Sequence, residues 1–257
     1  MQRNPLPIHI ESVAQYERLI QETCVGQAPC CFRGENNVES DKALLPVLLH
    51  PRNAHIVDQN DFPGPLESPD YARTFRETMD QLMMSGDRRF LQSEEDLSAA
   101  DYIAWICTAH LEGVPTLLLD WSLNPFTALL FACRSCPHEQ LNSIGEVWQM
   151  TLKPMHESEH LTIHLDKARD SDQMHCNAIT KILQNGLPLN EPIAIHSGPI
   201  SLIDADRKWF IYSCRPEPIN QIPSQIDRPW TDLQCIARIE GGDLKERIQA
   251  ELLGRKW

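Results

Sequence analysis

One segment near the middle of the chain, residues 113–136 (GVPTLLLDWSLNPFTALLFACRSC), places the tightest constraint on the fold. Its three consecutive leucines, Leu117 to Leu119, predict a strand that is buried on both faces. Ser122 or Asn124, followed by Pro125, predicts the start of a helix, because proline is tolerated in the first helical turn. We therefore expect a buried strand that leads directly into a core helix.

The remaining pattern favours an α+β domain. Apolar periodicity and capping residues predict helices over residues 11–22, 41–49, 70–85, 98–113, 170–186 and 242–254. Short apolar runs bounded by glycine or proline predict strands over residues 30–34, 115–121, 145–152, 192–197, 208–214 and 234–241. Helices cluster early and strands late, which favours a mixed or antiparallel sheet flanked by helices over a doubly wound fold. We expect one domain over residues 1–257.

Composition restricts the partners of this chain. It holds 36 acidic and 23 basic residues, a net charge of −13, which opposes broad binding to duplex nucleic acid because phosphate binding needs a dense basic face. A local basic pocket for a small anion is still compatible with this charge. The sequence has no run of about 18 apolar residues and no signal-peptide pattern, so we expect a cytoplasmic protein without membrane contact. Its nine cysteines are expected to be reduced and mostly buried.

Two motifs resemble the FRG domain family, which is named for an aromatic-Arg-Gly motif near its start. The first is Phe32, Arg33 and Gly34, and the second is HLEGVPTLLLDWSLNPFTALLFA, residues 110–132. The second is similar to the family's His-aromatic-Gly-Leu-Pro-Thr-Arg-Leu-Leu-Asp-Trp run and the helix that follows it. Weaker similarity in GEVWQMTL and IARIEGGDLKERIQAELLG extends the resemblance over roughly residues 28–254.

This chain departs from the family pattern at two motifs. Leu117 stands where the family has an arginine, so one expected positive charge is absent. In ADRKWF, Asp206 stands where a glutamine is usual and Lys208 where a glycine is usual. The resemblance therefore indicates a divergent member of the family.

The resemblance implies a nucleotide-binding role. The aromatic-Arg-Gly motif is similar to the first motif of ADP-ribosyltransferases, in which the arginine holds the phosphates of NAD, and it implies an ADP-ribosyltransferase-like fold. By this analogy Arg33 contacts the phosphates of NAD or a related nucleotide, and Asp120 or Asp206 assists ADP-ribosyl transfer or glycosidic cleavage. The analogy adds five ligand-binding candidates: Phe32, Gly34, His110, Thr116 and Trp121. The family also implies a bacterial or phage protein, including defence or toxin modules.

Physical chemistry agrees with a phosphate contact, because a guanidinium is permanently charged and binds phosphate in a bidentate manner, and a glycine lets the backbone approach a ligand. A structural reading competes with it. A buried arginine needs a carboxylate, so Arg33 and Asp120 can pair simply to hold the fold together. In that case the chain is a non-catalytic domain that recognises a protein partner or a ligand, and the departures at Leu117 and Asp206 favour this alternative.

Two further motifs could bind zinc. HESEH offers His156, Glu157 and His160 in a His-Glu-x-x-His pattern, with His164 as a third ligand, and gives zinc-dependent hydrolysis as a further alternative function. No apolar helical face runs through this motif, so a solvated loop or helix start is favoured. CRSCPH offers Cys133, Cys136 and His138. A single Cys-x-x-Cys is a weak signal, and Cys133 falls on an apolar helical face, so we expect a core thiol there and no metal cofactor.

Overall fold

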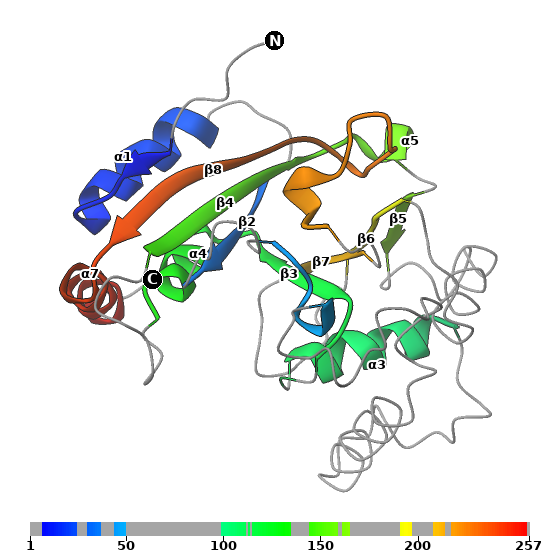
Figure 1. Cartoon of the computed structure of the whole chain (residues 1–257), viewed down its shortest axis with the longest axis horizontal. Coiled ribbons are helices and arrows are strands. Elements are labelled where there is room, and N and C mark those ends of the chain that lie inside the picture. Colours follow the sequence, from blue (N-terminus) through cyan, green and yellow to red (C-terminus); the bar gives the residue numbers. More distant parts are fainter. Residues whose placement is uncertain are drawn as a thin grey trace, which may run out of the picture. The chain divides into compact units, whose positions relative to one another are not determined.

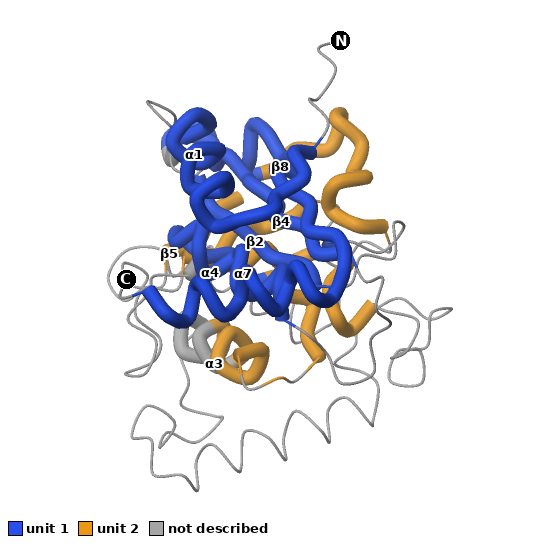
Figure 2. The backbone as a smooth tube through the Cα atoms, turned by 90° about the vertical axis from the view of Figure 1, so that its left-hand side faces the viewer, with its two compact units in different colours: residues 1–44, 120–157, 229–257 blue, residues 45–119, 158–228 orange. Residues whose placement is uncertain are grey.

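The computed structural model of this 257-residue chain describes residues 7–24, 30–36, 44–49, 99–111, 113, 115–134, 144–158, 161–164, 191–196, 208–213 and 217–255. The chain divides into two compact units built from interleaved segments (Figure 2). Unit 1 takes in residues 1–44, 120–157 and 229–257, and unit 2 takes in residues 45–119 and 158–228. The single domain predicted over the whole chain stays a prediction.

Unit 1 is built on a mixed sheet. Its strands are β1 (Ile8–His9), β2 (Cys30–Glu35), β4 (Ile144–Leu152), β8 (Trp230–Glu240) and the end of β3 (Leu118–Ser122). The order is β1-β8-β4-β2-β3, in which β1 runs parallel to β8 and the other pairs are antiparallel. The long strands β4 and β8 lie side by side (Figure 1).

Three helices pack against one face of the unit 1 sheet: α1 (Val13–Cys24), α4 (Pro125–Ala132) and α7 (Gly242–Gly254). Their apolar residues form one core with the strands, in which Tyr16 packs edge-on against Phe126 with ring centroids 5.8 Å apart. The Tyr16 hydroxyl also donates to the Pro125 carbonyl at 3.0 Å, so α1 is fixed to the start of α4.

The start of α4 depends on Asn124. Its side-chain Oδ1 accepts a hydrogen bond from the Phe126 amide at 2.9 Å, and Pro125 occupies the first helical turn. An N-cap side chain satisfies an amide that has no partner inside the helix. We expect Asn124→Ala to lower the free energy of unfolding by about 1 kcal/mol and Asn124→Asp to leave it nearly unchanged, as measured by urea denaturation. Equal stability of the alanine and aspartate variants would contradict this role.

Unit 2 holds a second set of strands and a helix. The strands are the start of β3, β5 (Thr162–His164), β6 (Ile193–His196) and β7 (Lys208–Tyr212), and the helix is α3 (Ala99–Leu111). The order is β3-β7-β6-β5, in which β5 and β6 are parallel and β6 and β7 antiparallel. The Ser213 amide donates to the Leu117 carbonyl at 3.1 Å beside β3. Short 3-10 helices form at Val47–Leu49 and Ile219–Gln221.

The α+β class with a mixed sheet is confirmed, since each unit combines parallel and antiparallel strand pairs with helices. The helices predicted over residues 70–85 and 170–186 lie outside the described residues. None of the helices among the described residues is long and apolar enough to cross a membrane.

The helix predicted over residues 41–49 is wrong for its described part. Only Val47–Leu49 is helical, as a 3-10 turn. Leu44 has a positive φ of 62°, and the residue before Pro46 is disfavoured from helical geometry by the proline ring. The apolar spacing of this segment therefore reflects a buried turn rather than a helix.

Candidate functional site

Strand β2 separates two kinds of side chain onto the two faces of the unit 1 sheet. Phe32 is buried in the core that the helices cover. A side chain at Gly34 would point toward α4, since an added Cβ would lie 1.9 Å from the Ala128 carbonyl oxygen. Alternation along a strand places Arg33 and Glu35 on the opposite face. Phe32 and Gly34, two ligand-binding candidates, therefore make packing contacts with the helical layer.

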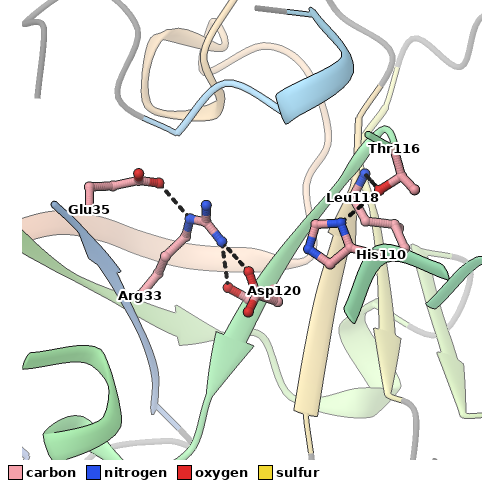
Figure 3. Close-up of polar contacts among 6 residues, drawn as sticks. All are labelled: Arg33, Glu35, His110, Thr116, Leu118 and Asp120. Carbon is pink, nitrogen blue, oxygen red and sulfur yellow. Dashed lines mark hydrogen bonds and ion pairs between the residues drawn. The ribbon is translucent and has the colours of Figure 1, made fainter. Parts of the chain in front are cut away.

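Arg33 is held by two carboxylates. Its Nε donates to Glu35 Oε1 at 2.6 Å, and its Nη1 donates to Asp120 Oδ1 and, at 3.0 Å, to the Asp120 carbonyl oxygen (Figure 3). Asp120 is positioned because β3 pairs with β2 in the antiparallel sense, with Phe32 opposite Ser122. The pairing of Arg33 with Asp120 that the structural reading predicts is thus present. We call Arg33, Glu35 and Asp120 the Arg33 cluster.

The Arg33 cluster is partly shielded from water and carries a net negative charge. The Arg33 side chain is 13% exposed, against 23% for Glu35 and 30% for Asp120. Burial lowers the pKa of Arg33, but the charges of Glu35 and Asp120 outweigh burial and hold that pKa above its usual range. One guanidinium and two carboxylates leave a single negative charge. Nη2 of Arg33 makes no hydrogen bond within the part of the chain that the structure describes.

A second charged group lies on the same face of the sheet, where Arg33 is in register with Trp148 and Glu35 with Glu146. Glu146 is 2% exposed and accepts from Arg238 Nε at 2.7 Å and from Trp148 Nε1 at 3.1 Å. Burial lowers the pKa of Arg238, while its bond to Glu146 raises it, and the net shift is upward. The face opposite the helices is therefore lined by paired acids and bases.

Trp121 follows Asp120 on β3 and is 1% exposed. Its indole Nε1 is buried and has no acceptor among the residues described here. Leu117, at the position where the resemblance predicts an arginine, is also buried at 5% exposure, so the position holds an apolar core residue.

In unit 2, His110 and Thr116 contact each other. His110 Nδ1 lies 2.7 Å from Thr116 Oγ1, which also accepts from the Leu118 amide at 3.2 Å (Figure 3). The ring of His110 packs edge-on against Phe210, with centroids 5.8 Å apart. Thr116 is fully buried, so this pair joins the end of α3 to the approach to β3.

The described members of the predicted zinc motif lie on two different elements. His156 and Glu157 lie on the four-residue helix α5 (Met155–Ser158), where their side chains are 80% and 54% exposed. His164 lies on β5 in unit 2 and stacks near His196 and Trp209. Within the described ranges, no group of three or more His, Cys, Asp or Glu side chains could hold a metal ion. His160 lies outside these ranges.

In the second zinc motif, CRSCPH, the structure describes one ligand candidate, Cys133, which is a core thiol. Cys133 is fully buried at the end of α4, and burial raises its pKa to about 12, although the nearby Lys245 lowers it. This burial agrees with the predicted core thiol. Cys136 and His138 lie outside the described residues, as does Asp206, the alternative catalytic acid.

Sequence reasoning missed three residues that shape this face: Glu35, Glu146 and Arg238. Glu35 carried a usable signal, because it stands two positions after Arg33 on the same strand and must share its face. Glu146 and Arg238 carried none, because their contact depends on the register between β4 and β8, where Glu146 lies opposite Arg238.

Residues 28–140 match the sequence model of the FRG domain. This segment includes the Phe32–Gly34 motif and the 110–132 motif, so the match confirms the resemblance to the FRG domain predicted from them. The predicted similarity of residues 141–254 lies beyond the matched segment. Comparison with curated proteins and comparison with solved structures each found no match.

Proposed function

We propose that the Arg33 cluster recognises a nucleotide such as NAD through one phosphate and the hydroxyls of a ribose. The observation that carries this proposal is the state of the guanidinium: Nε and Nη1 are fixed by Glu35 and Asp120, while Nη2 has no partner within the described ranges. A guanidinium that is already oriented loses little side-chain entropy when it binds a phosphate oxygen. Partly exposed carboxylates beside it can accept hydrogen bonds from sugar hydroxyls.

The charge of the cluster determines which ligands fit this proposal. The net negative charge of the cluster disfavours a bare phosphate, because two carboxylates repel the anion that one guanidinium attracts. A sugar phosphate brings hydroxyl donors to the carboxylates together with a phosphate for Nη2. We therefore expect affinity for NAD and ADP-ribose and little affinity for inorganic phosphate.

Catalysis is a second step of the proposal, and it depends on nucleotide binding. ADP-ribosyl transfer or glycosidic cleavage needs a carboxylate beside the oxocarbenium-like transition state. Asp120 is a weaker candidate for that role than the sequence alone indicates, because its charge is already compensated by Arg33. The identity of the acid, Asp120 or Asp206 by analogy, stays a prediction, and nucleotide binding is the first step to be tested.

A second function is favoured by the same ion pairs. Two of the three guanidinium nitrogens are occupied within the chain, at 13% exposure of the side chain. If the pairs only hold β2 against β3, the domain is a non-catalytic module that recognises a protein partner, and NAD does not bind through Arg33.

Thermal denaturation with a ligand series separates these functions. At a ligand concentration about 100 times the dissociation constant, we expect NAD and ADP-ribose to raise the melting temperature by about 5 °C. Nicotinamide riboside, which lacks phosphate, and inorganic phosphate are expected to raise it much less. Arg33→Lys, which keeps the charge but not the planar fork, should lose the shift, whereas the exposed control Arg18→Lys should keep it.

Two results would contradict nucleotide recognition at Arg33. One is a melting temperature that none of the ligands changes at any concentration that is soluble. The other is an equal shift in the wild type and in Arg33→Lys, which would place the ligand elsewhere. Either result would favour the partner-recognition module.

A further inference from the structure

Two cysteines meet at one edge of the unit 1 core, away from the Arg33 cluster. Cys24 is the last residue of α1, and Cys30 is the first residue of β2. Gln149 of β4 lies between them: its Nε2 is 3.8 Å from Cys24 Sγ and 3.2 Å from Cys30 Sγ. Both sulfurs therefore contact one nitrogen atom, which makes Cys24 and Cys30 the candidates for a pair.

The pair is more exposed than three of the four other described cysteines, and the fourth, Cys235, is half-buried as they are. Cys24 and Cys30 are both half-buried, so a small reagent can reach them, whereas Cys31, Cys107 and Cys133 are buried. Cys30 also affects the pKa of the Cys24 thiol. Burial raises the pKa of Cys24, the Thr23 hydroxyl lowers it, and the charge and hydrogen bond of Cys30 raise it.

Gln149 gives the pair a polar centre inside an otherwise apolar layer. Its side chain is 1% exposed, and its Oε1 is buried without a hydrogen-bond partner in the part of the chain that the structure describes. A buried acceptor without a hydrogen-bond donor costs free energy, so this amide is an unusual residue for a core position. Here Nε2 donates toward both sulfurs, so the amide holds the two thiols beside one point of the core.

We propose that Cys24 and Cys30 are a modification site that closes reversibly into an intrachain disulfide by exchange with a low-molecular-weight disulfide such as glutathione disulfide. One thiolate attacks a sulfur of glutathione disulfide, forms a mixed disulfide and releases one glutathione thiolate. The second thiolate then attacks the protein sulfur of the mixed disulfide and releases the second glutathione. The protein loses two protons and two electrons, and glutathione disulfide becomes two thiols.

Closure of this bond would tie the end of α1 to the start of β2, the strand that carries Arg33. The attacking species is the thiolate, so the rate of closure is expected to rise about tenfold for each pH unit below the thiol pKa. An excess of a dithiol reductant should reopen the bond.

Peptide mapping of the full-length protein tests the site. Reduced protein is freed of reductant, treated with glutathione disulfide, alkylated, and digested with trypsin without reduction. Trypsin releases residues 19–33 as one peptide that contains Cys24, Cys30 and the neighbouring Cys31. We expect this peptide to take up one alkyl group and lack two hydrogens, with fragmentation placing the bond between Cys24 and Cys30.

Three variants make the assignment specific. Cys24→Ser and Cys30→Ser should each abolish closure, whereas Cys31→Ala should still close, because Cys31 is buried and its Sγ points toward the Met150 carbonyl. Three alkylated cysteines after oxidation of the wild type would overturn the proposal. So would stable glutathione adducts on both cysteines, or a bond that forms to Cys31.

Discussion

Arg33→Ala is expected to lower the free energy of unfolding by about 3 kcal/mol, because it removes the cation that Glu35 and Asp120 both bind. The Arg33 side chain is 13% exposed and its partners are less than one-third exposed, so water compensates only part of this loss. Urea denaturation of the two proteins gives the difference.

A charge-free triple variant is the matched control for Arg33→Ala. Arg33→Met combined with Glu35→Gln and Asp120→Asn removes the cation and both anions together. Since replacing a whole ion-pair group is far less damaging than removing one member, its stability should lie within about 1 kcal/mol of the wild type. A loss of less than about 0.5 kcal/mol in Arg33→Ala would show that solvent screens the cluster, and would contradict its buried ion-pair character.

Gly34→Ala is expected to destabilise the fold by at least 3 kcal/mol, roughly the upper range for overpacking a core. An added Cβ would lie 1.9 Å from the Ala128 carbonyl oxygen and 2.7 Å from the Ala132 amide nitrogen. Both atoms belong to the backbone of α4, so no side chain can rotate away, and the helix must move off β2. Urea denaturation monitored by circular dichroism gives the loss.

Gly254→Ala serves as the control for Gly34→Ala. Among the described residues, apart from its chain neighbours and the backbone of its own helix, no atom lies within 4 Å of a Cβ added at Gly254, at the end of α7. Its stability should therefore stay within about 0.5 kcal/mol of the wild type. Equal effects of the two glycine substitutions would show that close packing of α4 on β2 is not the reason for Gly34.

The predicted helices and strands were found where hydrophobic periodicity and capping residues indicate the same element. The strand and the helix predicted within residues 113–136 are β3 and α4, with Asn124 as the cap and Pro125 in the first turn. The helix predicted over residues 242–254 has the bounds of α7. The turn at Leu44 and Pro46 was missed because apolar spacing alone does not reveal a positive φ.

The candidate site was predictable only in part. Asp120 was named as a partner for Arg33 because a charge between two buried elements needs compensation. The second partner, Glu35, and the pair formed by Glu146 and Arg238 depend on which strands are neighbours and in which register. Strand register is a property of tertiary structure, and one sequence does not encode it in a local pattern.

Glycine in the aromatic-Arg-Gly motif shows how one residue can have two explanations. Sequence reasoning assigned Gly34 to the close approach of a ligand. The structure gives it a packing reason, because α4 lies against the backbone of β2 at that point. Ligand contact at Arg33 and close helix packing at Gly34 concern opposite faces of the same strand, so the two roles can be tested independently.

The most direct test of nucleotide recognition is a crystal structure of the protein grown with NAD. We expect a phosphate oxygen about 2.7–2.9 Å from Arg33 Nη2, with Nε and Nη1 still bound to Glu35 and Asp120. A structure in which Arg33 contacts only these two carboxylates, while NAD binds elsewhere or not at all under saturating conditions, would contradict it. Arg33 would then be a structural ion-pair residue, and the partner-recognition module would be the function to pursue.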